Sequence, residues 1–119
     1  MAHGGVLRQH SDHPQLASHI MHDYTKANLD PETRGMLDFA TKLTREPANM
    51  SEADVKELRA LELSAEQILS VVLITCTFNF MTRLADGLGV QVPEGRQEAH
   101  ERWLTGPALQ QDWLMKAKP

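Results

Sequence analysis

Histidines and a single cysteine are the side chains of this 119-residue sequence best suited to chemistry. Five of the six histidines fall within the first 22 residues, and His19 and His22 have the i, i+3 spacing at which two helical side chains can share a metal ion. Against a zinc site, no cysteine pair and no H-E-x-x-H motif accompanies them, and His10 and His13 fall in an expected loop. We therefore predict no metal site and no cofactor.

Cys76 is the only cysteine, so the chain as given holds no disulfide framework. Thiol chemistry on a peroxide needs a thiolate to attack the O–O bond and a second thiol to resolve the sulfenic acid. Cys76 lies between Ile74 and Phe78 in an apolar run with no Lys, Arg or His within one helical turn. We expect Cys76 to be a buried and inert core residue.

Asn79 and Arg83 form the third candidate set, because their i, i+4 spacing puts two polar side chains on one face of an apolar helix. Polar groups in such surroundings must find partners. In a structural interpretation, Arg83 bonds a carboxylate or the C-terminus of a neighbouring helix and Asn79 satisfies backbone groups. In a functional interpretation, the two residues line a pocket.

The helix expected to position these residues runs from Ser64 to Val90. Ser64 and Gln67 form a capping box at its start, and Gly87 or Gly89 can close it in the left-handed conformation. Its apolar residues cover almost every direction around the axis, which is typical of a helix buried on all sides; they are Ile68, Leu69, Val71, Val72, Leu73, Ile74, Cys76, Phe78, Phe80, Met81 and Leu84. The uninterrupted apolar run is shorter than the roughly 20 residues of a membrane span. Because a short chain has few helices to surround it, we predict a homo-oligomer.

Six further helical regions are expected. Residues 3–10 resemble the end of a helix, and Pro14 opens a second helix through about residue 27. Asp30 and Pro31 cap a third, which Pro47 stops, with Met36, Leu37, Ala40 and Leu43 at core spacing. Ser51 and Asp54 begin a fourth that carries Val55, Leu58 and Leu61. Residues 94–104 and 107–116 read as two short C-terminal helices anchored by Trp103, Leu104, Leu109, Trp113 and Leu114.

Composition limits the class of protein. A hydrophobic content of 41% supports a packed core, and the length suits one domain over residues 1–119. A net charge of −4 and a pI near 5.8 argue against nucleic acid or an anionic membrane as a partner. The N-terminus has no apolar run of the signal-peptide type, so a cytoplasmic location is the default.

Three segments in order, MLDFATKLTREPANM, ADVKELRALELSAEQIL and FNFMTRLADGLGV, resemble the peroxidase-related branch of the carboxymuconolactone decarboxylase and alkylhydroperoxidase D superfamily. The resemblance implies an all-α, oligomeric fold with a long buried central helix. It also implies antioxidant oxidoreductases that reduce hydroperoxides with a C-x-x-C pair, followed four residues later by a histidine and a glycine. His3 matches that histidine. Counting back from it places both cysteines before Met1, so the N-terminal part of the family domain is missing from this sequence.

Three hypotheses for function remain open. The resemblance implies thiol-dependent hydroperoxide reduction, fed by a dithiol electron donor if a longer form of the chain exists, with His3 as the only residue of the catalytic motif present here. We expect the chain as given to be inactive in that reaction, because a histidine without its nucleophile has nothing to activate. A non-catalytic helical oligomer or binding module is the alternative. Lactone decarboxylase-like activity ranks third, because the F-N-F-x-x-R-L-A pattern is similar to the peroxidase-related branch.

Overall fold

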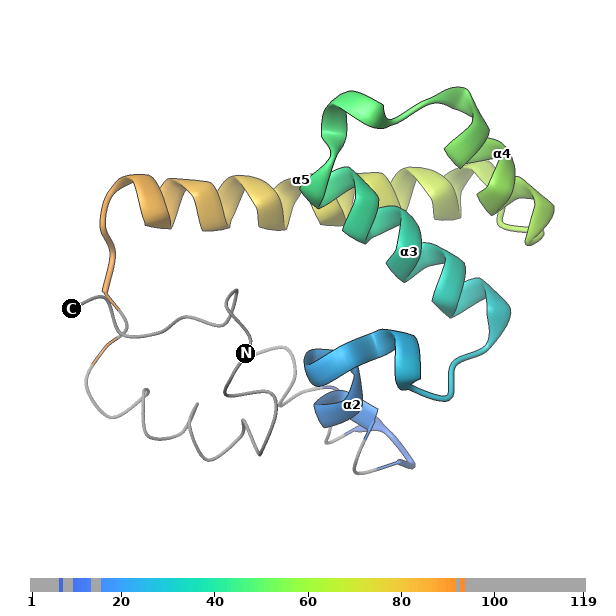
Figure 1. The fold of residues 1–119 in the computed structure, drawn as a ribbon, viewed down its shortest axis with the longest axis horizontal. Coiled ribbons are helices and arrows are strands. Elements are labelled where there is room, and N and C mark those ends of the chain that lie inside the picture. Colours follow the sequence, from blue (N-terminus) through green and yellow to red (C-terminus); the bar gives the residue numbers. More distant parts are fainter. Residues whose placement is uncertain (1–6, 8–9, 14–15, 92, 94–119) are drawn as a thin grey trace. The chain divides into compact units, whose positions relative to one another are not determined.

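The structure is a computed structural model that describes residues 7, 10–13, 16–91 and 93. The described residues form helices and their connections, with no strand among them, which confirms the all-α prediction. Backbone contacts divide the chain into two compact units, residues 28–90 and residues 1–27 with 91–119 (Figure 1). The helices predicted over residues 3–10, 94–104 and 107–116 lie outside the described residues, apart from Leu7 and His10.

The described helical part of the first unit is helix α2, Leu16–Asp23, followed by the 3₁₀ helix η1, Tyr24–Lys26. The sequence predicted one continuous helix through about residue 27, but the α-helix ends at Asp23. Asp23 adopts an extended backbone, and its carboxylate accepts hydrogen bonds from the Thr25 N–H at 3.1 Å and the Thr25 hydroxyl at 2.6 Å. This local bonding competes with helix continuation, as aspartate commonly does.

In the second unit, helix α3, Pro31–Arg45, starts where the sequence predicted. The Asp30 carboxylate accepts from the Thr33 N–H and the Thr33 hydroxyl, each at 2.7 Å, and Pro31 takes a first-turn position where its missing N–H costs nothing. The helix ends at Arg45, and a 3₁₀ turn, η2, Pro47–Asn49, follows.

Helix α4, Glu52–Ala60, begins at the predicted Ser51–Asp54 capping box, in which the Ser51 N–H donates to the Asp54 carboxylate at 2.8 Å. Glu62, at φ +65°, then turns the chain toward the long helix. Only a short turn separates α4 from the next helix, which begins at Ala65, and the two helices contact each other.

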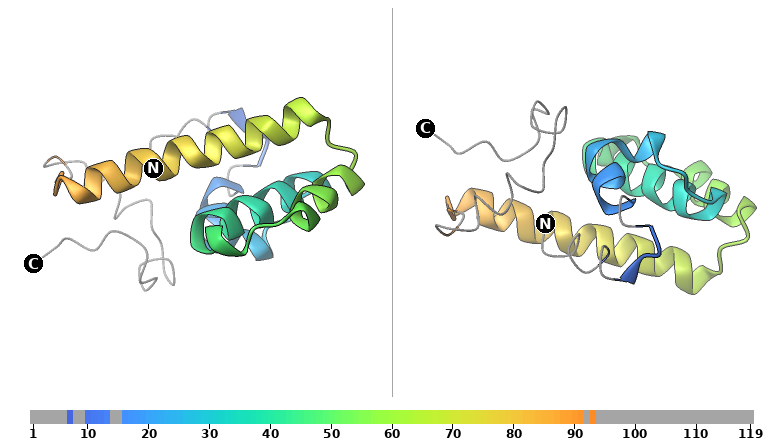
Figure 2. Two further views of the ribbon diagram at one scale, coloured as in Figure 1. Left: turned by 90° about the horizontal axis from the view of Figure 1, so that it is seen from above. Right: turned by 90° about the horizontal axis from the view of Figure 1, so that it is seen from below.

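Helix α5, Ala65–Gly87, is 23 residues long and packs beside α3 and α4 (Figure 2). The Ser64–Gln67 capping box is present, with the Ser64 N–H donating to the Gln67 amide oxygen at 2.7 Å. After the helix, Gly89 takes a φ of +64°, a conformation that favours glycine. Both predicted ends of this helix are therefore confirmed.

The core of residues 28–90 lies where α3, α4 and α5 meet. Its buried residues are Phe39, Leu58, Leu63 and Ile68, with Met36, Leu43, Met50, Val55, Leu61, Val71 and Val72 packed against them. The sequence analysis named Met36 and Leu43 on α3 but missed Phe39, and the predicted core residues Leu37 and Ala40 are only half-buried.

An ion pair between α3 and α4 borders this core. The Lys42 ammonium lies 2.5 Å from the Asp54 carboxylate, and Asp54 is buried at 8% exposure. Hydrogen bonds from Lys42, and then from the Ser51 N–H, lower the pKa of Asp54 below its usual value. A carboxyl group with a lowered folded-state pKa stabilises the fold above its unfolded-state pKa, and that contribution disappears as the pH falls through the folded-state value.

We therefore expect Asp54→Asn to melt at a lower temperature than the wild type at pH 7, with the difference shrinking once the pH falls below the ordinary aspartate pKa of about 3.9. Thermal denaturation followed by circular dichroism at a series of pH values measures this difference. Glu52→Gln is the matched control, because the exposed Glu52–Lys56 pair should contribute little at any pH. A constant difference from pH 7 to pH 3 would show that the Asp54 charge is not the cause.

Candidate functional site

Asn79 and Arg83 lie together on α5, as their spacing predicted. The Asn79 side-chain amide donates to the Thr44 hydroxyl at 3.0 Å, and the Thr44 hydroxyl in turn donates to the Ala40 carbonyl of α3 at 2.7 Å. The Arg83 guanidinium donates to the Asn79 backbone carbonyl at 3.3 Å. Asn79 thus ties the middle of α5 to the end of α3, while Arg83 is exposed beside it. The third predicted site residue, His3, lies outside the described residues.

Cys76 is exposed, which corrects the prediction that it is buried. The physical reason is that α5 packs on α3 and α4 by one face only, so that Ile68 is its single buried residue. The apolar residues of the helix were expected to be covered on all sides, but α3 and α4 cover only one side of it. No Lys, Arg or His lies within one turn of Cys76 on the helix, so nothing there stabilises a thiolate.

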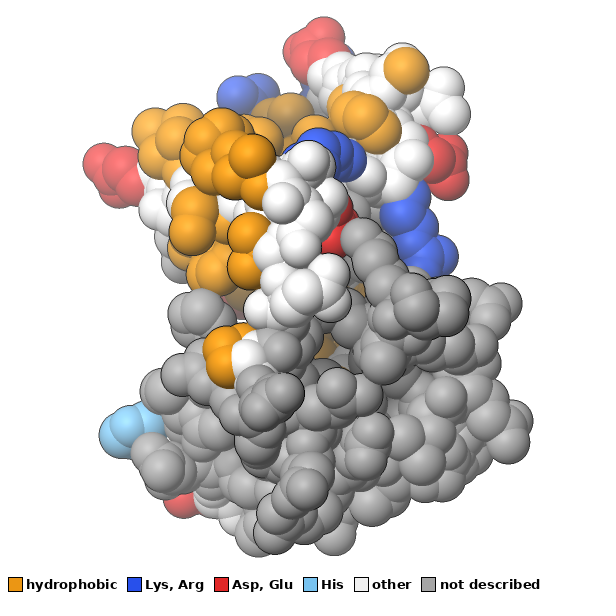
Figure 3. Space-filling model, turned by 90° about the vertical axis from the view of Figure 1, so that its left-hand side faces the viewer, with side chains coloured by type: hydrophobic (Ala, Val, Ile, Leu, Met, Phe, Trp, Pro, Cys, Tyr) orange, Lys and Arg blue, Asp and Glu red, His pale blue; other side chains and the backbone are white. Residues whose placement is uncertain are grey.

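The side of α5 turned away from α3 and α4 is the main exposed apolar surface of the described residues (Figure 3). Large apolar side chains from residue 69 to residue 90 are between 46% and 73% exposed. By length and composition α5 could also cross a membrane, and almost none of it is buried inside the chain. Its packed face nevertheless contacts two helices that carry charged side chains, Lys42 and Asp54 among them.

The N-terminal histidines were weighed as metal ligands in the sequence analysis, which predicted no metal site. Within the residues that the structure describes, no group of three or more His, Cys, Asp or Glu side chains is placed to hold a metal ion. His19 is exposed on α2.

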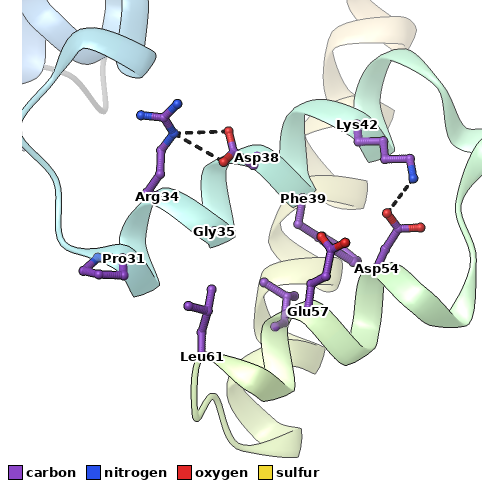
Figure 4. Close-up of a pocket in the computed structure, with 10 residues that line it drawn as sticks. Pro31, Arg34, Gly35, Asp38, Phe39, Lys42, Asp54, Glu57 and Leu61 are labelled. Carbon is purple, nitrogen blue, oxygen red and sulfur yellow. Dashed lines mark hydrogen bonds and ion pairs between the residues drawn. The ribbon is translucent and has the colours of Figure 1, made fainter.

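An open groove of about 420 Å³ lies between α3 and α4 (Figure 4). Two ion pairs border it, Arg34 with Asp38 at 3.3 Å and Lys42 with Asp54 at 2.5 Å. Its remaining lining residues are Pro31, Gly35, Phe39, Glu57, Leu58 and Leu61. Because its lining includes no Cys, His, Ser or Thr, the groove offers no thiol, hydroxyl or imidazole group for catalysis. The sequence analysis missed it, since its lining comes from two helices whose relative placement no local pattern fixes.

Comparison with solved structures supports the all-helical fold, whereas the sequence comparisons find no match. No protein-family model matches the sequence, and a comparison with curated proteins finds no match. Among solved structures, the fold is similar to an uncharacterized peroxidase-related protein from Silicibacter sp. TM1040, with a TM-score of 0.71 and 37% identity over 80% of this chain and 49% of that one. It is also similar to an alkylhydroperoxidase AhpD core, an uncharacterized peroxidase-related protein from Ralstonia eutropha JMP134, with a TM-score of 0.69 and 31% identity over 89% of this chain and 53% of that one. The chain therefore spans about half the length of both proteins.

Proposed function

Because the chain belongs to the alkylhydroperoxidase D-like superfamily, we propose that residues 1–119 are the helical body of a peroxidase-related protein and do not themselves carry out a dithiol peroxidase cycle. The observation that carries this proposal is the position of the only cysteine. Cys76 lies at the middle of α5, on its exposed side, with no cation or histidine within one helical turn and no second thiol in the sequence.

The chemistry of hydroperoxide reduction explains why this position matters. A thiolate attacks the O–O bond, an alcohol leaves, and the resulting sulfenic acid condenses with a second thiol to give a disulfide and water. A dithiol donor then reduces the disulfide. One cysteine within one chain cannot supply both sulfur atoms, and a mid-helix position lacks the helix N-terminus or the neighbouring positive charge that activates a thiol.

We expect purified protein of this sequence to consume no more hydroperoxide than the Cys76→Ala variant does when both are supplied with a dithiol donor such as dithiothreitol. Peroxide remaining in solution over time is the measurement, with circular dichroism confirming that both proteins are folded. Turnover by the wild type that depends on the donor and disappears in Cys76→Ala would refute the proposal.

A longer product with a C-x-x-C pair upstream of His3 is the second candidate. The observation that favours it is the length of the two similar structures, of which this chain spans 49% and 53%. In that product, residues 1–119 would complete a thiol-dependent hydroperoxide reductase. The intact mass of the protein isolated from its native source separates the candidates, since the sequence given has a mass of 13.4 kDa.

A further inference from the structure

We propose that the groove between α3 and α4 binds a small organic cation, a primary ammonium group carried on a short apolar body, and that Glu57 holds the positive charge. This inference goes beyond the proposed function, because every residue that lines the groove lies between Pro31 and Leu61 and none of them takes part in thiol chemistry. It stands whether or not a longer form of the protein reduces hydroperoxides.

The first observation is the shape of the groove. Its volume of about 420 Å³ falls within the range of small-molecule pockets. At one end Gly35 lets α3 approach α4 closely, since a Cβ at this position would overlap the Leu61 side chain. At the other end the Lys42–Asp54 ion pair joins the two helices (Figure 4). Both ends of the groove are therefore fixed by contacts between the helices, and a ligand would find the site already formed.

The floor of the groove is apolar. Phe39 of α3 and Leu58 of α4 line it and are 8% and 2% exposed. Leu61 continues the apolar surface just beyond the end of α4. All three side chains belong to the core of residues 28–90 or pack against it. A ligand that lies on this floor gains from an apolar body, whereas a fully hydrated ion does not.

The second observation is a surplus of one negative charge around this floor. The charged residues that line the groove are three carboxylates and two cations, namely Asp38, Asp54, Glu57, Arg34 and Lys42. Both oxygens of Asp38 accept from the Arg34 guanidinium at 3.3 Å, and Asp54 pairs with Lys42. The surplus charge therefore belongs to Glu57, and it favours a cationic ligand over an anionic one.

Glu57 is also the carboxylate that is available to a ligand. Asp54 uses both of its oxygens, one for the Lys42 ammonium at 2.5 Å and the other for the Ser51 N–H at 2.8 Å. Glu57, in contrast, has no hydrogen bond or ion pair with any residue that the structure describes. Its side chain extends from α4 toward α3 beside Phe39 (Figure 4). An ammonium group bound to Glu57 would therefore have its apolar body over the floor of the groove.

An ammonium group suits this site better than a metal ion does. A cation such as Ca²⁺ takes about six to eight oxygen ligands, and Glu57 alone supplies too few. Among the described residues, no group of acidic or histidine side chains is placed to complete such a set. An ammonium group needs only one carboxylate for a charge-assisted hydrogen bond. Its other N–H groups can stay hydrated, because the groove is open to solvent.

Phenethylammonium is the probe that tests the proposal, because it joins one ammonium group to one phenyl ring by a short chain. Titrated into the isotope-labelled full chain at physiological ionic strength, it should shift the backbone amide resonances of Gly35, Glu57 and Leu61. We expect a Kd of about 1 mM, an ordinary affinity for so small a ligand. Hydrocinnamate, which carries a carboxylate on the same ring and a similar chain, should not bind. Ammonium chloride, which has no apolar body, should leave these resonances unshifted at the same concentration.

Glu57→Gln should weaken the binding of phenethylammonium by about 10-fold or more, because it removes the charge-assisted hydrogen bond. Glu66→Gln is the matched control. Glu66 is exposed in the first turn of α5, outside the groove, so the same change of charge there should alter the Kd by less than about two-fold. Circular dichroism establishes that both variants are folded. Equal weakening by the two variants, binding of hydrocinnamate as tight as that of phenethylammonium, or no shift of the groove resonances at about 10 mM probe would each overturn the proposal.

Discussion

Leu58→Ala is expected to lower the free energy of unfolding by about 2–5 kcal/mol, the usual cost of emptying a buried leucine site. Leu58 is 2% exposed and is the largest fully buried side chain among the described residues. It packs with Phe39, Leu63 and Ile68, so its loss leaves a cavity where three helices meet. Small domains are stable by only about 5–15 kcal/mol, and this single change could therefore unfold much of the population.

Urea denaturation followed by circular dichroism measures this loss for Leu58→Ala. Val90→Ala is the control: its side chain is 64% exposed beyond the end of α5, and a surface change of this kind stays within about 0.5 kcal/mol. If the two variants unfolded at the same urea concentration, Leu58 would not be a core residue in solution.

Phe39→Ala is expected to destabilise the fold by about 3–5 kcal/mol. Phe39 is 8% exposed, extends from α3 into the same core and also lines the groove between α3 and α4. The chain offers a matched comparison in Phe80, which is 63% exposed on α5. Measured by denaturation at a concentration low enough to keep the chain monomeric, Phe80→Ala should cost much less than Phe39→Ala. Equal costs would mean that the two phenylalanines are equally buried.

Helix ends were predictable from the sequence because capping is local. Asp30, the Ser51–Asp54 pair and the Ser64–Gln67 pair each satisfy backbone donors within three residues of themselves, and each cap is present in the structure. Gly89 closes α5 for an equally local reason, its positive φ. No knowledge of the rest of the fold is needed for these features.

Burial was less predictable because it depends on neighbours that the local pattern does not specify. On α3, Phe39 and Ala40 are adjacent, and the sequence pattern placed Ala40 in the core. The packing of α4 and α5 against α3 buries Phe39 instead. On α5, apolar residues all around the axis indicated burial on every side. Cys76 is exposed because only one side of α5 meets other helices of residues 28–90.

For the candidate site residues, too, the local features were predictable and the long-range contacts were not. Asn79 and Arg83 share a face because of their spacing, which the sequence shows directly. That Asn79 bonds Thr44, 35 residues earlier in the chain, could not be deduced from spacing. Whether either residue serves a pocket of the whole protein stays a prediction, as does the role of His3.

The rate at which the Cys76 thiol reacts with a stoichiometric amount of hydroperoxide tests most directly the claim that this chain carries no peroxidase centre. Rapid mixing, followed by acid quenching and mass spectrometry of Cys76, gives that rate. We predict a rate no faster than that of free cysteine in the same buffer, because nothing within one turn of Cys76 on the helix activates the thiol. A reaction orders of magnitude faster than free cysteine would show that Cys76 is a peroxidatic residue and would contradict the claim.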